Sequence, residues 1–160
     1  MTIASDTSSI TSLLQIGLIE VLHSLFGEIT ITPAVHQELL RIRKQKLALE
    51  NLDWIIVTAP HDREMVAELT KQLDLGESES IALALETKAE YLLIDESQGR
   101  QVAENLGIRI IGVLGVLIQA KKKNLISDLE TEIESLYSIG FRLDRKLVRS
   151  VLERLRKAGD

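Results

Sequence analysis

The segment YLLIDESQGRQVAENLGIRIIG, from Tyr91 to Gly112, contains the pattern that decides the fold of this chain. Tyr91 to Ile94 is an apolar run that predicts a buried strand, and Asp95 follows it directly. The residues from Glu96 to Leu106 predict a helix, and Ile108 to Ile111 predicts the next strand. A strand, a helix and a second strand in this order are typical of a parallel sheet that is covered by helices.

The same alternation continues on both sides of this segment. Further strands are expected at Thr2 to Ser5, Glu28 to Thr32 and Trp54 to Val57. A first helix is expected after a cap at Ser8 or Ser9 as far as Gly17, and Gly76 is expected to break the chain before another helix. The remaining helices are expected at Leu18 to Phe26, Pro33 to Leu47, Asp62 to Leu73, Glu77 to Thr87, Val113 to Lys122, Ser127 to Tyr137 and Arg142 to Arg156. We therefore predict a single-domain, three-layer α/β/α fold over residues 1–160, with a mostly parallel central sheet and a helical C-terminal third.

Composition excludes several classes of protein. The 160 residues are 45% hydrophobic and contain no cysteine, which rules out disulfides, thiolate zinc sites and cysteine nucleophiles. The start of the chain lacks the pattern of a signal peptide, and apolar runs such as Ile108 to Ile118 are shorter than the about 20 residues that span a bilayer. A cytoplasmic protein without membrane segments is expected.

Charge and aromatic content limit how the chain could bind nucleic acid. The net charge of −5 argues against broad, charge-driven binding, although it allows an enzyme that uses divalent cations and local basic clusters. An aromatic share of 3% makes a base-stacking platform a poor hypothesis.

Carboxylates at the ends of predicted strands are the candidate chemistry. Asp6 and Asp95 each follow an apolar strand, and the carboxyl ends of parallel strands form the crevice where such sheets bind ligands. Glu38 lies early in the helix after Pro33, and Glu77 and Glu79 lie at the start of another helix. Carboxylates that converge on one crevice repel each other unless a cation neutralises them, and Mg²⁺ or Mn²⁺ suits oxygen ligands.

Each of these acids also has an ordinary structural interpretation. An acid at the start of a helix usually complements the helix dipole, which would account for Glu77 and Glu79. Asp6 could cap a helix, and Glu38 could be a solvated helix residue. The constellation, and not any one acid, therefore carries the prediction of a site.

Four segments of the chain resemble PIN-domain nucleases. They are SDTSSITSLLQIG (Ser5 to Gly17), ITITPAVHQEL (Ile29 to Leu39), LGESESIALALE (Leu75 to Glu86) and LLIDESQGRQVAENLGIRIIGVLGVL (Leu92 to Leu117). They occur in the order of the family and cover nearly the whole chain. More narrowly, they resemble a small bacterial and archaeal subgroup that is related to the toxins of toxin–antitoxin pairs.

The resemblance implies a PIN-like fold and assigns roles to the acids. Asp6, Glu38 and Asp95 match family acids, and either Glu77 or Glu79 takes the place where many PIN proteins carry Asp. Asp6, Asp95 and one of these two glutamates would then bind Mg²⁺ or Mn²⁺. The catalytic set would be completed by Glu38, which ligates the metal or orients water.

Nearby polar residues are candidates for supporting roles. Glu96 could act as an outer-sphere acid, and Thr7 or Ser8 could hydrogen-bond a ligand carboxylate or a phosphate. Arg100 is the best single candidate for a phosphate contact. Basic residues on the last helix, from Arg142 to Arg149, could contact RNA or form an ordinary solvated face.

These observations predict a metal-dependent endoribonuclease that hydrolyses RNA phosphodiesters. The resemblance further implies a toxin, a small antitoxin protein as its partner, and a homodimer. The main alternative is a catalytically inactive PIN-like module that binds RNA or protein. A receiver-like phosphotransfer protein is a third interpretation, but the pair of adjacent acids that it needs after the first strand is absent.

Overall fold

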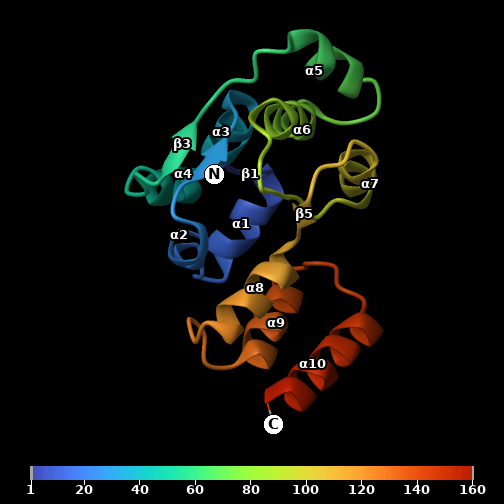
Figure 1. Ribbon diagram of the computed structural model, residues 1–160. Coiled ribbons are helices and arrows are strands. Elements are labelled where there is room, and N and C mark those ends of the chain that lie inside the picture. The colour runs from blue at the N-terminus through green and yellow to red at the C-terminus, as the bar shows by residue number, and fades with distance from the viewer. Residues whose placement is uncertain (1, 160) are drawn as a thin grey trace.

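A computed structural model describes residues 2–159 of the chain, and these residues form five strands and ten helices (Figure 1). The strands are β1 (Ile3–Ser5), β2 (Ile29–Ile31), β3 (Ile55–Val57), β4 (Tyr91–Leu93) and β5 (Ile110–Ile111). They form one sheet in the order β3-β2-β1-β4-β5, in which every neighbouring pair is parallel. The predicted α/β/α fold is confirmed, and the sheet is parallel throughout.

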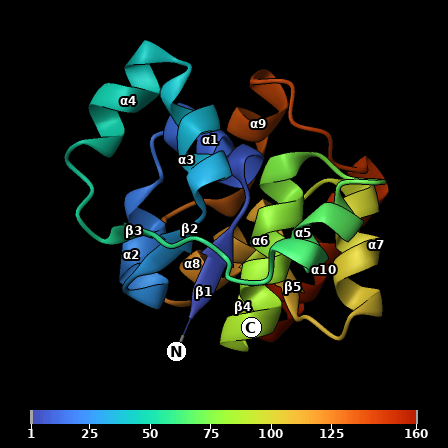
Figure 2. The same cartoon turned by 90° about the horizontal axis from the view of Figure 1, so that it is seen from above.

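Helices follow the strands along the chain and cover the sheet, as the view from above shows (Figure 2). The helices are α1 (Thr7–Gln15), α2 (Glu20–Phe26), α3 (Pro33–Leu40), α4 (Arg43–Leu49), α5 (Arg63–Leu69), α6 (Leu75–Thr87), α7 (Ser97–Asn105), α8 (Val113–Lys122), α9 (Leu129–Ser138) and α10 (Arg145–Gly159). The last three helices form the predicted helical C-terminal third.

Strand β1 occupies the middle of the sheet. It pairs with β2 through Ala4 and Thr30, and with β4 through Ile3 and Tyr91 and through Ser5 and Leu93. The backbone N–H of Asp6 extends the second pairing by donating to the Leu93 carbonyl at 2.9 Å. The register therefore brings the residues that follow β1 and β4 to the same edge of the sheet.

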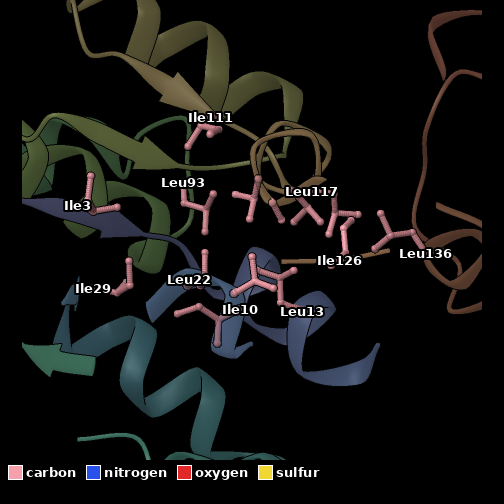
Figure 3. Packing of buried hydrophobic residues seen from close by; sticks show 14 of the residues in the cluster. Ile3, Ile10, Leu13, Leu22, Ile29, Leu93, Ile111, Leu117, Ile126 and Leu136 are labelled. Atoms are coloured by element: carbon pink, nitrogen blue, oxygen red, sulfur yellow. The ribbon is translucent and has the colours of Figure 1, made fainter. Parts of the chain in front are cut away.

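Two apolar clusters lie on the two faces of the sheet. Successive side chains of a strand point to opposite faces, so Ile3 and Leu93 join one cluster, whereas Ala4, Leu92 and Ile94 join the other. The first cluster is the larger one and extends from the sheet through α1 and α2 to α8 and α9 (Figure 3). The second is built with α5, α6 and α7. The two clusters fix how α1, α6, α7 and α8 approach the sheet.

The predicted helix from Pro33 to Leu47 is divided into two. Helix α3 ends at Leu40, α4 begins at Arg43, and Ile42 between them is extended, with φ −102° and ψ 114°. The segment is rich in basic residues, and α4 fully buries only Gln45 and packs only Leu49 partly against the core, so little apolar surface favours one continuous helix.

Two predicted helix starts also differ from the structure. The cap of α1 is Asp6 instead of Ser8 or Ser9. Gly76 lies inside α6, because Asp74 caps this helix and Leu75 begins it. A Cβ added at Gly76 would lie 2.5 Å from Oε1 of Glu38, so packing against the α3 side chain explains this glycine better than a helix break does.

Within residues 2–159, no single helix is long and apolar enough to cross a membrane. The pair α1 and α2 reaches the required length and composition together, but it is bent by 118°.

Candidate active site

Asp6 stands at the carboxyl end of β1 and is 3% exposed. Its Oδ1 accepts a hydrogen bond from the backbone N–H of Ser9 at 3.0 Å, and its Oδ2 accepts one from the Ser8 hydroxyl at 3.2 Å. An aspartate is a good N-cap because its carboxylate satisfies an N–H that the first turn leaves free. The cap holds the Asp6 carboxylate at the start of α1, beside the neighbouring strand β4.

Asp95 occupies the corresponding place after β4. Its Oδ2 accepts a hydrogen bond from the Ser9 hydroxyl at 3.0 Å, and the backbone N–H of Val113 lies 3.2 and 3.1 Å from Oδ1 and Oδ2. Ser9 therefore bridges the two aspartates, with its N–H on Asp6 and its hydroxyl on Asp95. Val113 is the first residue of α8, so three segments of the chain position this carboxylate.

Glu38 reaches the same region from α3. Its Oε2 accepts a hydrogen bond from the Thr7 hydroxyl at 2.7 Å. Because Gly76 has no side chain, α6 passes close to Oε1 of Glu38 without a clash. Thr7 was predicted to support a carboxylate, and the structure identifies Glu38 as the carboxylate that it contacts.

Glu77 is turned toward the other acids from the first turn of α6. Its Oε2 is buried and has no hydrogen-bond partner within residues 2–159, and a Cβ added at Gly99 would lie 2.5 Å from it. Asp74 and Glu96, the caps of α6 and α7, are its acidic neighbours. Asp74 is an acid of this region that the sequence interpretation missed, although an Asp three residues before Glu77 is a recognisable cap signal.

Glu79 is turned away from these acids. Its Oε1 accepts a hydrogen bond from the backbone N–H of Ala34 at 2.9 Å, and its Oε2 accepts one from Arg63 Nη1 at 2.7 Å. It is 4% exposed and joins α6 to the first turn of α3 and to α5. Of the two glutamates that the sequence left open, Glu77 is thus the one that lies beside the other acids.

A pocket of about 400 Å³ lies among these residues. Its wall contains hydroxyl groups of α1, including those of Thr7 and Ser8, and five carboxylates, which belong to Asp6, Glu38, Asp74, Glu77 and Glu96. Within the described part of the chain, no lysine or arginine lines it. Asp95 lines an adjoining pocket of about 570 Å³, which shares Ser8, Ser12 and Glu96 with the first. We call the first the acidic pocket and the adjoining one the second pocket.

Burial weakens the acidity of these groups. It raises the pKa of Asp6 to about 6, against the opposing effect of the hydrogen bonds from Ser9 and Ser8, and the negative charge of Asp95 adds to the rise. Burial also raises the pKa of Asp95, although bonds from Val113 and Ser9 and the charge of Arg100 oppose it. For Glu77, burial together with Asp74 and Glu96 raises the pKa to about 8. Keeping these buried carboxylates charged is therefore unfavourable.

The donor atoms fit a hard divalent cation. All are carboxylate or hydroxyl oxygens, and Oε2 of Glu77 is buried with no hydrogen-bond partner within residues 2–159. A cation would also offset the burial, and for Asp6 and Glu77 the neighbouring acids, that raise these pKa values. In their present positions, however, no three His, Asp or Glu side chains of the described residues form a group that could hold a metal ion. The chemistry of the ligands fits, and their spacing would have to tighten around the ion.

The predicted phosphate contact, Arg100, lies behind Asp95. Its Nη1 donates to the Ile94 carbonyl at 3.0 Å, and a Cβ added at Gly112 would lie 2.8 Å from the same atom. The residue is half-buried and lines neither pocket. Its contact with phosphate stays a prediction, whereas its effect on the pKa of Asp95 follows from its position.

The other basic residues are divided between two environments. Arg142 lines the second pocket. Arg145 instead stacks over Tyr137, 4.1 Å from the ring centre, and lies 3.8 Å from Glu134, which holds α10 against α9. The helix predicted from Arg142 begins only at Arg145, so Arg142 precedes α10 and the predicted basic face is not one continuous helix face.

Comparison with known proteins agrees with this architecture. Residues 2–157 match a family model that is described as a PIN domain. No curated protein sequence gives a significant match to the chain. PIN domains are generally nucleases, and an acidic pocket at the carboxyl ends of a parallel sheet is consistent with that fold. Because the match extends over nearly the whole length, the chain belongs to the PIN-domain family.

Proposed function

We propose that this PIN domain is a metal-dependent endoribonuclease that hydrolyses RNA phosphodiesters with Mg²⁺ or Mn²⁺. The observation that carries the proposal is the convergence of five carboxylates on one pocket, one of them with a buried, unpartnered oxygen within residues 2–159. A structural role rarely requires so many acids in one place, because their mutual repulsion lowers stability.

The protein's own groups suit the hydrolysis of a phosphodiester. Asp6, Glu77 and, from the adjoining wall, Asp95 are the candidate ligands, and Ser9 and Val113 keep the two aspartates in fixed orientations. Glu38, fixed by Thr7, is placed to accept a hydrogen bond from the attacking water and orient it. When bound, Mg²⁺ or Mn²⁺ would stabilise the charge that develops on the phosphate and on the leaving oxygen.

A second candidate function is a PIN-like module that binds RNA or protein without cleaving it. It is favoured by one observation: the acids of the described residues form no group that could hold a metal in their present positions. The toxin role, an antitoxin partner and a homodimer rest on the resemblance alone, and we retain them as proposals.

Cleavage assays with a metal titration separate the two candidates. Purified protein is incubated with labelled RNAs and single-stranded DNA in EDTA, Mg²⁺ or Mn²⁺, beside the Asp95→Asn variant. The proposal expects cleavage of RNA that requires metal and is lost in the variant. A folded protein that cleaves none of these substrates and does not bind Mn²⁺ by calorimetry would support the binding module instead.

A further inference from the structure

The second pocket adjoins the acidic pocket but differs from it in character. Its volume of about 570 Å³ falls in the range of about 300–1,000 Å³ that is usual for small-molecule sites. It shares Ser8 and Ser12 with the acidic pocket, and Asp95 and Glu96 contribute acidic groups to its near wall. A molecule bound at the two aspartates would therefore extend directly into the second pocket.

The far wall comes from the connection between α9 and α10, through Gly140, Phe141 and Arg142. This connection is well anchored. The backbone N–H of Phe141 donates to the Leu136 carbonyl at 3.0 Å, and the Tyr137 hydroxyl donates to the Leu143 carbonyl at 3.2 Å. Phe141 is half-buried and packs against the main apolar cluster. The wall is thus a fixed part of the fold.

Arg142 supplies a positive charge to this wall. Its side chain is exposed, and no carboxylate of residues 2–159 forms an ion pair with it. Within the described part of the chain, no other lysine or arginine lines either pocket. The two pockets together thus contain several carboxylates and one free guanidinium, which belongs to the second pocket.

We propose that the second pocket binds the nucleotide next to the scissile bond of a single-stranded nucleic acid, with Arg142 on its phosphate. The inference rests on the proposed nuclease function, because it assumes that the scissile phosphate lies in the acidic pocket. A flexible single strand can place successive phosphates in two adjoining pockets, whereas a rigid duplex cannot bend into them. A protein of net charge −5 also attracts the dense charge of a duplex poorly. The ring of Phe141 provides an apolar surface for the base.

Binding measurements test the role of Arg142. Fluorescent single-stranded RNA is titrated with Asp6→Asn protein in Mn²⁺, where cleavage is expected to be absent, with and without Arg142→Gln. Loss of one phosphate contact should make the slope of log K against the logarithm of salt concentration less steep by about 0.7. Arg154→Gln is the matched control, because it removes the same charge from an exposed position on α10 that lines neither pocket. The control should keep the slope of the parent protein.

Neutral methylphosphonates, introduced one at a time around the cleavage position, locate the contact. In the parent protein, replacement of the adjoining phosphate should weaken binding. In Arg142→Gln the same replacement should have little further effect, because the two changes remove the same interaction. A Phe141→Leu variant, which keeps the apolar packing, should weaken binding when the adjoining nucleotide has a base but not when it is abasic.

The outcomes separate this inference from the proposed function. If the wild-type protein cleaves RNA and Arg142→Gln matches Arg154→Gln in salt slope and KM, the inference is overturned and the nuclease stands. Equal competition by duplex and single-stranded RNA would also overturn it. If binding depends on Arg142 but no metal supports cleavage by the wild-type protein, the second pocket keeps its ligand and the nuclease proposal fails.

Discussion

The Ser9 hydroxyl donates a hydrogen bond to Asp95 at 3.0 Å, across 86 positions of sequence. Ser9 is fully buried, and its backbone N–H donates to the Asp6 carboxylate that caps α1. One residue thus connects the two aspartates of the candidate site through different groups. The sequence interpretation considered Ser9 only as a helix cap, so this connection could be recognised only in the structure.

Replacing Ser9 with Ala should separate these two contacts. The N–H that binds Asp6 remains, whereas Asp95 loses a donor, so the pKa of Asp95 should rise further and Mn²⁺ should bind more weakly at neutral pH. Loss of a hydrogen bond to a charged group should also lower the free energy of unfolding by about 1.5–3 kcal/mol. Urea denaturation and calorimetric titration with Mn²⁺ measure the two effects. Ser135→Ala, whose hydroxyl bonds only a carbonyl of α9, is the control.

The buried carboxylate of Asp6 should make stability depend on pH. Its pKa is raised from 3.8 to about 6, so below about pH 4 the group is neutral in both states. Between about pH 4 and 6 only the unfolded chain loses the proton, so the folded state is progressively destabilised, and above about pH 6 the loss is complete. The full effect corresponds to about 3 kcal/mol. Asp6→Asn, which can still cap α1, should therefore be more stable than the wild-type protein at pH 8 in EDTA.

Urea denaturation of both proteins from pH 4.5 to 8 checks this prediction. The difference in the free energy of unfolding should shrink as pH falls, because protonation neutralises the wild-type carboxyl. A difference that is constant with pH would show that the Asp6 charge does not oppose folding. Mn²⁺ should raise the Tm of the wild-type protein more than that of the variant, since a ligand stabilises the state that binds it.

Gly76→Ala should disturb the site more than the fold. The new Cβ would lie 2.5 Å from Oε1 of Glu38, which must move and weaken its bond with Thr7. Alanine favours a helix over glycine, by about 1 kcal/mol in an interior and by less at the second residue of α6, which offsets part of the strain. We expect nearly unchanged stability and at least a tenfold lower rate of metal-dependent cleavage.

Gly115→Ala is the matched control for this change. It is the same substitution within a helix, and its Cβ would meet only Ile111, at 2.9 Å from Cγ1. It should lower stability while the cleavage rate of the folded protein stays constant. Equal loss of cleavage in both variants would indicate that the rate responds to general packing and not to the position of Glu38.

Replacing the two glutamates at the start of α6 should affect different properties, stability for Glu79 and cleavage for Glu77. Glu79→Ala leaves the Ala34 N–H without its acceptor and should lower the free energy of unfolding by about 2 kcal/mol. Glu77→Gln removes a carboxylate whose pKa is raised to about 8, so it should keep the stability and abolish metal-dependent cleavage. Denaturation and cleavage assays compare them. A cleavage defect in folded Glu79→Ala protein with full activity in Glu77→Gln would assign the metal ligand to Glu79.

Much of the fold could be predicted from local patterns. Short apolar runs between polar segments predict the five strands, because a strand buried in a parallel sheet needs apolar residues on both faces. The neighbours of each strand could not be predicted in this way. The chain visits β2 and β3 before it returns to β4 beside β1, and this pairing depends on contacts that no local pattern contains.

The candidate site shows the same division. Asp6 and Asp95 were found because both follow strands, and a cap residue is recognisable from its sequence. Glu77 and Glu79 could not be distinguished, because they lie about 200° apart around a helix and the rotation of α6 decides which one faces the crevice. The low helix propensity of glycine suggested that Gly76 breaks a helix. The close approach of Glu38 to Gly76, which explains this glycine, could not be recognised in the sequence.

The pairing of β1 with β4 also determines when the site is formed during synthesis. Asp6 is translated early, but its cap partner Ser9 reaches Asp95 only after 86 further residues. At about 5–20 residues per second, the ribosome needs roughly 4–17 s for that distance. Until then the chain contains nearly all residues of the acidic pocket but lacks Asp95, and α8, whose N–H holds Asp95, is made later still. Under the proposed function, a nascent chain therefore remains inactive until most of it has been synthesised.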